Sequence, residues 1–177
     1  MINYTLVKQT LYTWATSQVP VGMPVIFYEP NAPRPNQAYV SLYLSNTTQV
    51  NQDWTADETD ANGIVDMKGD RQFTLQIQAY GDEALNVLEN LRTSLQKQTV
   101  LDILRAGGIV FYISLGINDI TSLVDSQFER RAQMDVTLGI GQTYTDNPGY
   151  FDEVEIEEII SDAENVVYQE FITISAP

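Results

Sequence analysis

The feature that most constrains the fold is strict alternation of apolar and polar residues in two long stretches. In residues 71–81, RQFTLQIQAYG, positions 73, 75, 77 and 79 are apolar and the residues between them are polar. Residues 126–141, SQFERRAQMDVTLGIG, alternate in the same way. A period of two is typical of a β-strand with one buried face. The two stretches therefore predict two core strands of a sheet.

Helical spacing of apolar residues predicts helices that cover this sheet. A stripe runs through residues 4–16, and a second runs through residues 81–98, where Asp82 is the expected N-cap. A third, short helix is expected over residues 99–108, ending at two glycines. The buried stripes are predicted to contain Tyr4, Val7, Leu11 and Trp14 in the first helix, and Leu85, Leu88, Leu91 and Leu95 in the second.

Shorter patterns complete the expected fold. Strands are predicted over residues 25–29, 38–51, 109–117 and 166–175, and residues 118–123 are expected to form a turn or short helix. Residues 52–70 read as a long exposed hairpin loop with an Asn62-Gly63 turn. Consecutive strands and helices of this kind predict an α+β fold, with a mostly antiparallel (mixed) β-sheet, helices on one face and a C-terminal strand extension. We expect an α+β domain over residues 1–148 and an acidic β-hairpin or arm over residues 149–177.

Composition excludes several kinds of chemistry. The 177 residues include no cysteine and no histidine, which rules out disulfides, thiolate or imidazole ligands, and Ser-His-Asp or Cys-His catalysis. Nine basic and 24 acidic residues give a net charge of −15, which opposes nucleic-acid binding. No apolar run approaches the roughly 20 residues of a membrane span, and residues 1–18 lack the pattern of a signal peptide. We expect no cofactor and assembly in the cytosol.

Two acidic motifs are weak signals for a metal site or an enzyme. The sequence ETDANG, residues 58–63, is similar to the start of a calcium loop, but the twelfth position is Gly69, where a bidentate glutamate belongs. The carboxylates near the C-terminus are spread along a strand rather than paired across a cleft, as glycoside hydrolysis requires. We therefore predict neither a metal site nor catalytic residues.

The triplet Glu129-Arg130-Arg131 is the main candidate site. The strand period places Arg130 on the apolar face and Glu129 and Arg131 on the polar face. Arg130 would then need an oxygen partner, so a structural salt bridge, a subunit contact and an anion site all remain open. The uncharged glutamine face of residues 71–81 and the loop residue Trp54 are further candidate interface positions, and each also fits a purely local role.

The C-terminal segment concentrates negative charge. Residues 150–171 hold eight carboxylates, and no basic residue follows Arg131. We expect this segment to form a hairpin, or an arm that pairs with a neighbouring chain. The candidate residues for an acidic lumen or arm are Asp152, Glu153, Glu155, Glu157 and Glu158.

Three stretches together resemble the neck and tail terminator proteins of tailed bacteriophages. They are PRPNQAYVSLYL, then RQFTLQIQAYGDEALNVLENLRTSL, then NDITSLVDSQFERRAQMDVTLGI, within residues 33–140. The order and spacing of these modest motifs carry the resemblance, and the acidic C-terminal segment lies outside it. The positions that the resemblance carries over, without an assigned role for each, are Arg71, Tyr80, Gly81, Glu129 and Arg130.

The resemblance implies a structural virion protein without catalytic residues. Such a protein forms a ring, usually of about six copies, that caps the tail tube and joins it to the head connector. The implied partners are other copies of the chain, the tail tube protein, the connector or adaptor, and a sheath or collar protein. DNA would pass through the channel without specific binding, and the protein would reside in the virion after assembly in the bacterial cytoplasm.

Two other functions fit the same sequence. One is a head-completion, connector or collar adaptor, which would act at another position in the phage neck. The other belongs to a different class: an acidic protein that imitates DNA and binds a nucleic-acid-binding partner, with an affinity that falls steeply in salt.

Overall fold

The computed structural model describes residues 1–28, 33–56, 59–60, 62–124, 127–149, 153–162 and 165–175. Their contacts define two compact units: unit 1 comprises Met1–Trp54 and Lys68–Tyr144, and unit 2 comprises Thr55–Met67 and Thr145–Pro177. The division into domains at residue 148 stays a prediction. In chain order the elements are α1 (Tyr4–Gln18), β1 (Val25–Phe27), β2 (Tyr39–Gln49), β3 (Trp54–Thr55), β4 (Val65–Tyr80), α2 (Ala84–Ser94), α3 (Gln98–Ala106), β5 (Ile109–Ser114), β6 (Asn118–Asp119), β7 (Ser122–Val124), β8 (Gln127–Glu129), β9 (Arg131–Asp146), β10 (Glu153–Asp162) and β11 (Asn165–Ser175).

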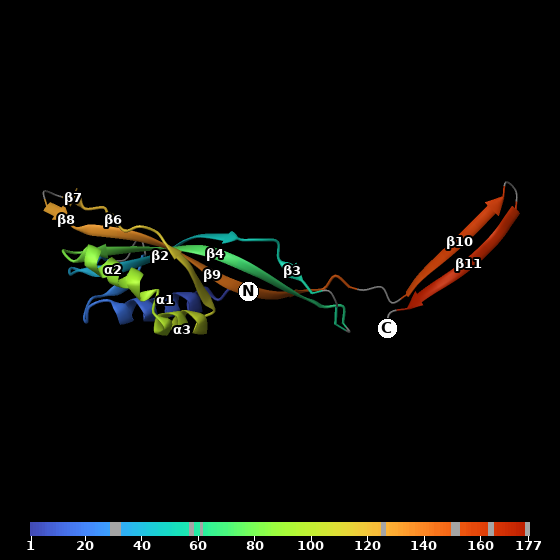
Figure 1. Ribbon diagram of the computed structural model, residues 1–177, viewed down its shortest axis with the longest axis horizontal. Helices are drawn as coiled ribbons and strands as arrows, with labels where there is room; N and C mark the ends of the chain where they lie inside the picture. Colours follow the sequence, from blue (N-terminus) through green and yellow to red (C-terminus); the bar gives the residue numbers. More distant parts are fainter. Residues whose placement is uncertain are drawn as a thin grey trace. The chain divides into compact units, whose positions relative to one another are not determined.

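A mixed, mostly antiparallel sheet in the order β1-β2-β4-β9-β5 is the centre of the fold. Strand β1 pairs parallel to β2, while β2 with β4 and β5 with β9 pair antiparallel. Helices α1, α2 and α3 lie on one face of this sheet (Figure 1). The predicted α+β class and the single helix-covered face are confirmed.

The two alternating stretches supply the centre of the core. Residues 73, 75, 77 and 79 of β4 are buried, as are residues 132, 134, 136 and 138 of β9. From the helical layer, Trp14 is fully buried, and its Nε1 donates a hydrogen bond of 2.9 Å to Oγ of the buried Ser94 on α2. Asn3 caps α1, because its side chain accepts from the backbone N–H of Leu6.

Three predictions about the helices are wrong: two buried positions and one N-cap. Tyr4 and Leu85 are exposed rather than buried. In α2 the buried face contains Ala84, Val87, Leu88 and Leu91, which follow helical spacing and leave Leu85 one position off the stripe. Glu83, not Asp82, occupies the N-cap position, and it makes no side-chain cap bond. The carboxylate of Asp82 faces Arg130 instead.

The segment before β9 also differs from expectation. Residues 118–123 form neither a simple turn nor a helix, since β6 pairs with β9 and β7 pairs with β8. The predicted strand over residues 126–141 is interrupted at Arg130, which separates β8 from β9. Beyond this break Phe128 is 75% exposed. The alternation that holds within β9 therefore does not extend back to Phe128 and Arg130.

Unit 2 contains an antiparallel hairpin and a tight turn. Strands β10 and β11 pair with Val154 opposite Ile174 and Ile156 opposite Ile172. In the predicted Asn62-Gly63 turn, Gly63 adopts a φ of +76°, a conformation that favours glycine. The carboxylate of Asp60 accepts from the backbone N–H groups of Ile64 and Asn62, which lowers its pKa. Glu58, the first residue of the calcium-like motif, lies outside the described residues. No described helix is long and apolar enough to cross a membrane.

Candidate interaction surface

The face of the sheet opposite the helices is polar and uncharged along most of its length. Three glutamines, Gln76 and Gln78 of β4 and Gln133 of β9, are half-buried and bond to one another. Nε2 of Gln78 lies 3.2 Å from Oε1 of both Gln76 and Gln133, and the hydroxyl of Tyr80 donates to Oε1 of Gln78 at 2.8 Å. This ladder fixes the amides in place and leaves a firm polar surface.

A groove of about 390 Å³ lies on this face. At its end the rings of Tyr39 and Tyr80 stack, with centroids 4.3 Å apart and planes 8° apart. Burial, and then the neighbouring Tyr80, raise the pKa of Tyr39 to about 12. The groove combines aromatic rings, amides and two guanidinium groups: its lining residues are Tyr28, Arg34, Ser41, Tyr43, Gln76, Gln78, Tyr80 and Arg131.

One of these side chains, Arg131, has a nitrogen donor without a hydrogen-bond partner among the described residues. Its guanidinium carbon lies 5.6 Å from the centroid of the Tyr80 ring, in a cation–π contact. Its Nε is buried and has no hydrogen-bond partner within the described part of the chain. A buried donor without an acceptor is costly. The guanidinium of Arg131 therefore lacks one of the acceptors that it needs within the described residues.

The three residues of the triplet make three different contacts rather than one cluster. Glu129 Oε1 lies 3.7 Å from Nη1 of Arg34. Arg130 Nε lies 3.4 Å from Oδ1 of Asp82, and its side chain is 65% exposed. Its predicted place on the apolar core face is therefore wrong. The strand is interrupted at Arg130, between β8 and β9. The backbone carbonyl of Arg130 accepts a hydrogen bond of 3.0 Å from the backbone N–H of Gly81, directly after β4.

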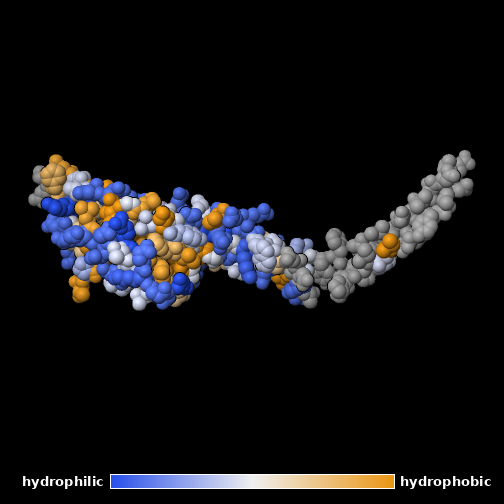
Figure 2. Space-filling model, in the orientation of Figure 1, coloured by the Kyte–Doolittle hydropathy of each residue, from blue (hydrophilic) through white to orange (hydrophobic). Residues whose placement is uncertain are grey.

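Next to the triplet is a second depression, whose lining mixes apolar side chains with the charged residues Asp82, Asp119, Arg130 and Arg131. It has a volume of about 250 Å³ and includes Phe128 and Leu85 from β8 and α2, together with Arg130 and Arg131. Leu123, which pairs with Phe128 across the β7–β8 hairpin, is also exposed. Figure 2 shows a hydrophobic area at the end of unit 1 where this hairpin lies. Exposed apolar side chains gathered in this way are typical of a contact surface.

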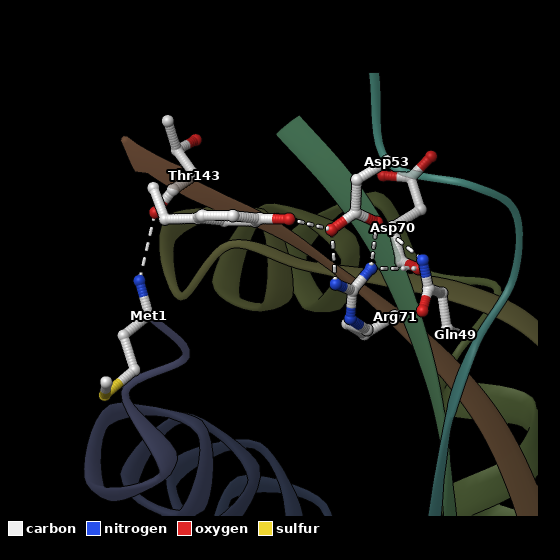
Figure 3. A network of polar contacts seen from close by, with 7 residues as sticks. Met1, Gln49, Asp53, Asp70, Arg71 and Thr143 are labelled. Atoms are coloured by element: carbon white, nitrogen blue, oxygen red, sulfur yellow. Dashed lines mark hydrogen bonds and ion pairs between the residues drawn. The ribbon is translucent and has the colours of Figure 1, made fainter. Parts of the chain in front are cut away.

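The strongest ion pair in the described residues holds the loop after β2. The guanidinium of Arg71, on β4, donates two hydrogen bonds of 2.6 Å to the two carboxylate oxygens of Asp53 (Figure 3). Tyr144, near the end of β9, and Gln49 donate to the same carboxylate at 2.7 and 3.0 Å. Hydrogen bonds from Arg71 and Tyr144 lower the pKa of Asp53 to about 2. The network gives Arg71 a structural role in unit 1.

Sequence reasoning singled out Arg71 but missed Asp53 and Tyr144. The available signal was a single arginine in line with the apolar face of a core strand, because position 71 precedes positions 73, 75, 77 and 79 at the same spacing of two. An arginine in such a position requires a carboxylate partner. The sequence could not identify that partner, because many acidic residues lie within reach. Gly69 is a further missed residue: a Cβ at this position would overlap the carboxylate of Asp53.

The remaining predicted positions have local surroundings. Trp54 is 52% exposed, and Nζ of Lys68 lies 5.5 Å from its ring centroid. A role for Trp54 as a partner anchor stays a prediction. Among the acidic candidates, Asp152 lies outside the described residues. The other four follow the backbone of β10, where Glu153 is opposite Ser175, Glu155 opposite Thr173, Glu157 opposite Phe171 and Glu158 opposite Glu170.

Charge is divided very unequally between the two units. The residues of unit 1 include all nine basic residues and eleven acidic ones, a net charge of −2. Those of unit 2 include thirteen acidic residues and no basic ones, a net charge of −13. Unit 1 therefore contains all of the arginines and is nearly neutral overall, while unit 2 carries almost all of the net negative charge.

The chain is similar to one protein family and to a solved structure. A family model described as phage neck terminator protein matches residues 6–170. No curated protein sequence matches the chain. Among solved structures, the chain is similar to the sheath/tube terminator of an extracellular contractile injection system, PVC, in its extended state, with a TM-score of 0.49 and 12% sequence identity. The similarity covers 93% of this chain and 64% of that one, so the chain spans less than two thirds of that relative.

Proposed function

This chain belongs to the phage neck terminator protein family, as its sequence motifs predict, and on that premise we propose that it forms a ring of about six copies that caps the tail tube. In this proposal the ring stops growth of the tube and joins it to the head connector. Its partners are further copies of the chain, the tube protein, the connector and a sheath or collar protein. Its role is structural, without catalysis or cofactors.

The observation that carries the proposal, beside the family, is the unequal division of charge. One surface of unit 1 presents arginines and amides, while unit 2 has a net charge of −13. Contacts between two different surfaces of the same chain produce a ring when the rotation between copies closes. A wall of acidic residues facing a channel would also repel phosphates and let DNA pass without binding.

Exposed apolar residues give the ring further contact area. Strand β5 is at one end of the strand order, and Val110, Tyr112 and Ile113 on it are exposed. An edge strand with apolar side chains is a surface on which another chain can pair. Unit 1 therefore has more than one surface suited to a neighbour.

Solution mass and imaging test this function. The purified chain is measured by light scattering, and the same peak is imaged in negative stain, alone and after addition of phage tail tubes. We expect rings of about six copies, or rings at tube ends where the free chain is monomeric. A chain that stays monomeric and leaves tube ends bare would refute the proposal.

Two alternatives give different results in this experiment. An adaptor of the head connector would bind connector particles and leave tail tubes bare. The charge of unit 2 favours an acidic DNA mimic as the alternative from another class. A mimic would remain a monomer or dimer, and its affinity for a basic DNA-binding protein would fall steeply as salt rises.

A further inference from the structure

We propose that the arginine groove of one copy receives the acidic hairpin β10–β11 of a neighbouring copy. The arginine groove is the groove on the polar sheet face that contains Arg34 and Arg131. The proposal rests on the ring described above and deepens it, because it names which two surfaces meet.

The groove has unused capacity to bind carboxylates. Arg131 has a buried Nε without an acceptor among the described residues. Arg34 is exposed, and its pair with Glu129 is 3.7 Å long. Exposed pairs of this length contribute little. The buried Nε itself is out of reach, but Arg34 and the part of Arg131 that lines the groove can bind new carboxylates. Guanidinium–carboxylate pairs favour specific, bidentate geometry.

Amides and hydroxyls around the arginines suit an incoming strand. Gln76, Gln78 and Tyr80 present polar atoms on the groove floor, while Tyr28 and Tyr43 form an edge-to-face pair with centroids 5.7 Å apart. Such groups can bond to backbone and side chains of a peptide laid across them, and tyrosines are common in interface cores. The groove is thus a polar, aromatic surface rather than an apolar one.

The hairpin is the part of the chain whose charge is complementary to this groove. Glu153, Glu155 and Glu157 alternate along β10, so these positions share one face of the hairpin. No basic residue exists in unit 2 to neutralise them. A row of three carboxylates at a spacing of two residues is complementary in charge to a groove with two guanidinium groups.

The hairpin also needs a partner for its own stability. A single two-stranded hairpin is marginal in water. Its register places Val154 opposite Ile174 and Ile156 opposite Ile172, and Ile172 is 42% exposed. Arg131 lines both the groove and the depression that contains Phe128 and Leu85. The positions of Val154, Ile156, Ile172 and Ile174 share the face opposite to that of Glu153, Glu155 and Glu157. A hairpin that lays its glutamate face on the groove would meet both guanidinium groups and place Phe171, the residue opposite Glu157, on the same side.

Engineered cysteines test the contact directly, because the natural chain has none. Tyr43→Cys and Glu157→Cys place one thiol in the groove and one on the hairpin. Labelled and unlabelled full-length chains are mixed, oxidised with and without tail tubes, and digested for mass spectrometry. We expect disulfides between labelled and unlabelled chains. The matched control pair is Tyr12→Cys with Glu157→Cys, which places the first thiol at an exposed tyrosine of α1, on the helical layer.

Charge reversal gives a second measurement. The groove variant is Arg34→Glu with Arg131→Glu, and the hairpin variant is Glu153→Lys, Glu155→Lys and Glu157→Lys. Each alone should weaken self-association at least about tenfold, because like charges then meet. An equimolar mixture should restore association, since each variant supplies the charge that the other lacks. Circular dichroism verifies that both variants fold.

The outcomes separate this contact from the proposed function. Disulfides confined within single chains, no disulfides under either condition, or equal yield from the control pair would overturn the contact. A mixture that associates no better than its components would do the same. If the wild-type chain caps tail tubes and the Tyr43→Cys/Glu157→Cys variant forms no disulfides between chains, the proposed function stands and this contact fails. If the disulfides form but tubes stay bare, the contact stands and the function fails.

Discussion

The guanidinium of Arg71 donates two parallel hydrogen bonds to the carboxylate of Asp53, which lies 18 positions away in the sequence. Nη1 bonds to Oδ1 and Nη2 to Oδ2, each at 2.6 Å. The pair is mostly buried, with side chains 15% and 6% exposed. It attaches the loop after β2 to the middle of β4, and the hydroxyl of Tyr144 adds β9 to the same point. Three segments of unit 1 thus depend on one carboxylate.

Removal of that carboxylate charge should lower the stability of unit 1. We expect Asp53→Asn to reduce the Tm, because it leaves the guanidinium of Arg71 half-buried without its counter-ion. Arg71→Lys should also reduce the Tm, since a lysine cannot make the two parallel bonds. Gln49→Ala, which removes one weaker bond to Asp53, is the matched control and should have a smaller effect. Thermal unfolding followed by circular dichroism measures all three.

The same pair makes stability depend on acidic pH. The pKa of Asp53 falls from 3.8 to about 2 on folding, so its charged form is favoured in the folded state. Its contribution is complete above pH 4 and is lost as the pH falls from about 4 to 2. The Tm advantage of the wild type over Asp53→Asn should be constant above that range and shrink within it. An advantage that does not change down to pH 2 would contradict the assignment.

Gly69 is predicted to be essential to the same network. A Cβ at position 69 would overlap the carboxylate of Asp53. A Cβ there would also overlap Nη1 of Arg71. We expect Gly69→Ala to displace this pair and lower the Tm, and to have little further effect in a chain that already carries Asp53→Ala and Arg71→Ala. Gly141→Ala is the control, because a Cβ there meets no atom within 4 Å. Equal melting temperatures for the two alanine variants would count against this account.

The buried bond between Trp14 and Ser94 joins α1 to α2. Ser94→Ala should destabilise the chain by about 1–3 kcal/mol, because it leaves the indole N–H of Trp14 buried without an acceptor. Thr13→Ala is the matched control on α1, since the Thr13 hydroxyl bonds only to an exposed carbonyl of its own helix. Urea unfolding measures the difference in the free energy of unfolding. The idea fails if both variants lose the same amount.

Much of the fold was predictable, because periodicity reports burial directly. The alternation from Phe73 to Ala79 predicted the buried face of β4, and that from Ala132 to Leu138 predicted the buried face of β9. The stripe of Val7, Leu11 and Trp14 predicted the inner face of α1 in the same way. These features depend on local sequence alone, so they can be read from it.

Other features of the fold depend on contacts between residues that are distant in the sequence, so the sequence alone could not predict them. The break at Arg130 arises because its carbonyl bonds to Gly81, 49 positions earlier. Strands β6, β7 and β8 have only two or three residues, too few to show a period. Asp53, the partner of Arg71, lies on a loop, and Tyr144, which donates to Asp53, lies near the end of β9; no sequence pattern marks either residue.

The central claim is that this chain assembles as a ring on the tail tube. The most direct measurement adds the purified chain to tail tube protein during polymerisation and images the products by electron microscopy. We expect shorter tubes with a ring of about six copies at one end. Tubes of unchanged length with bare ends would contradict the claim.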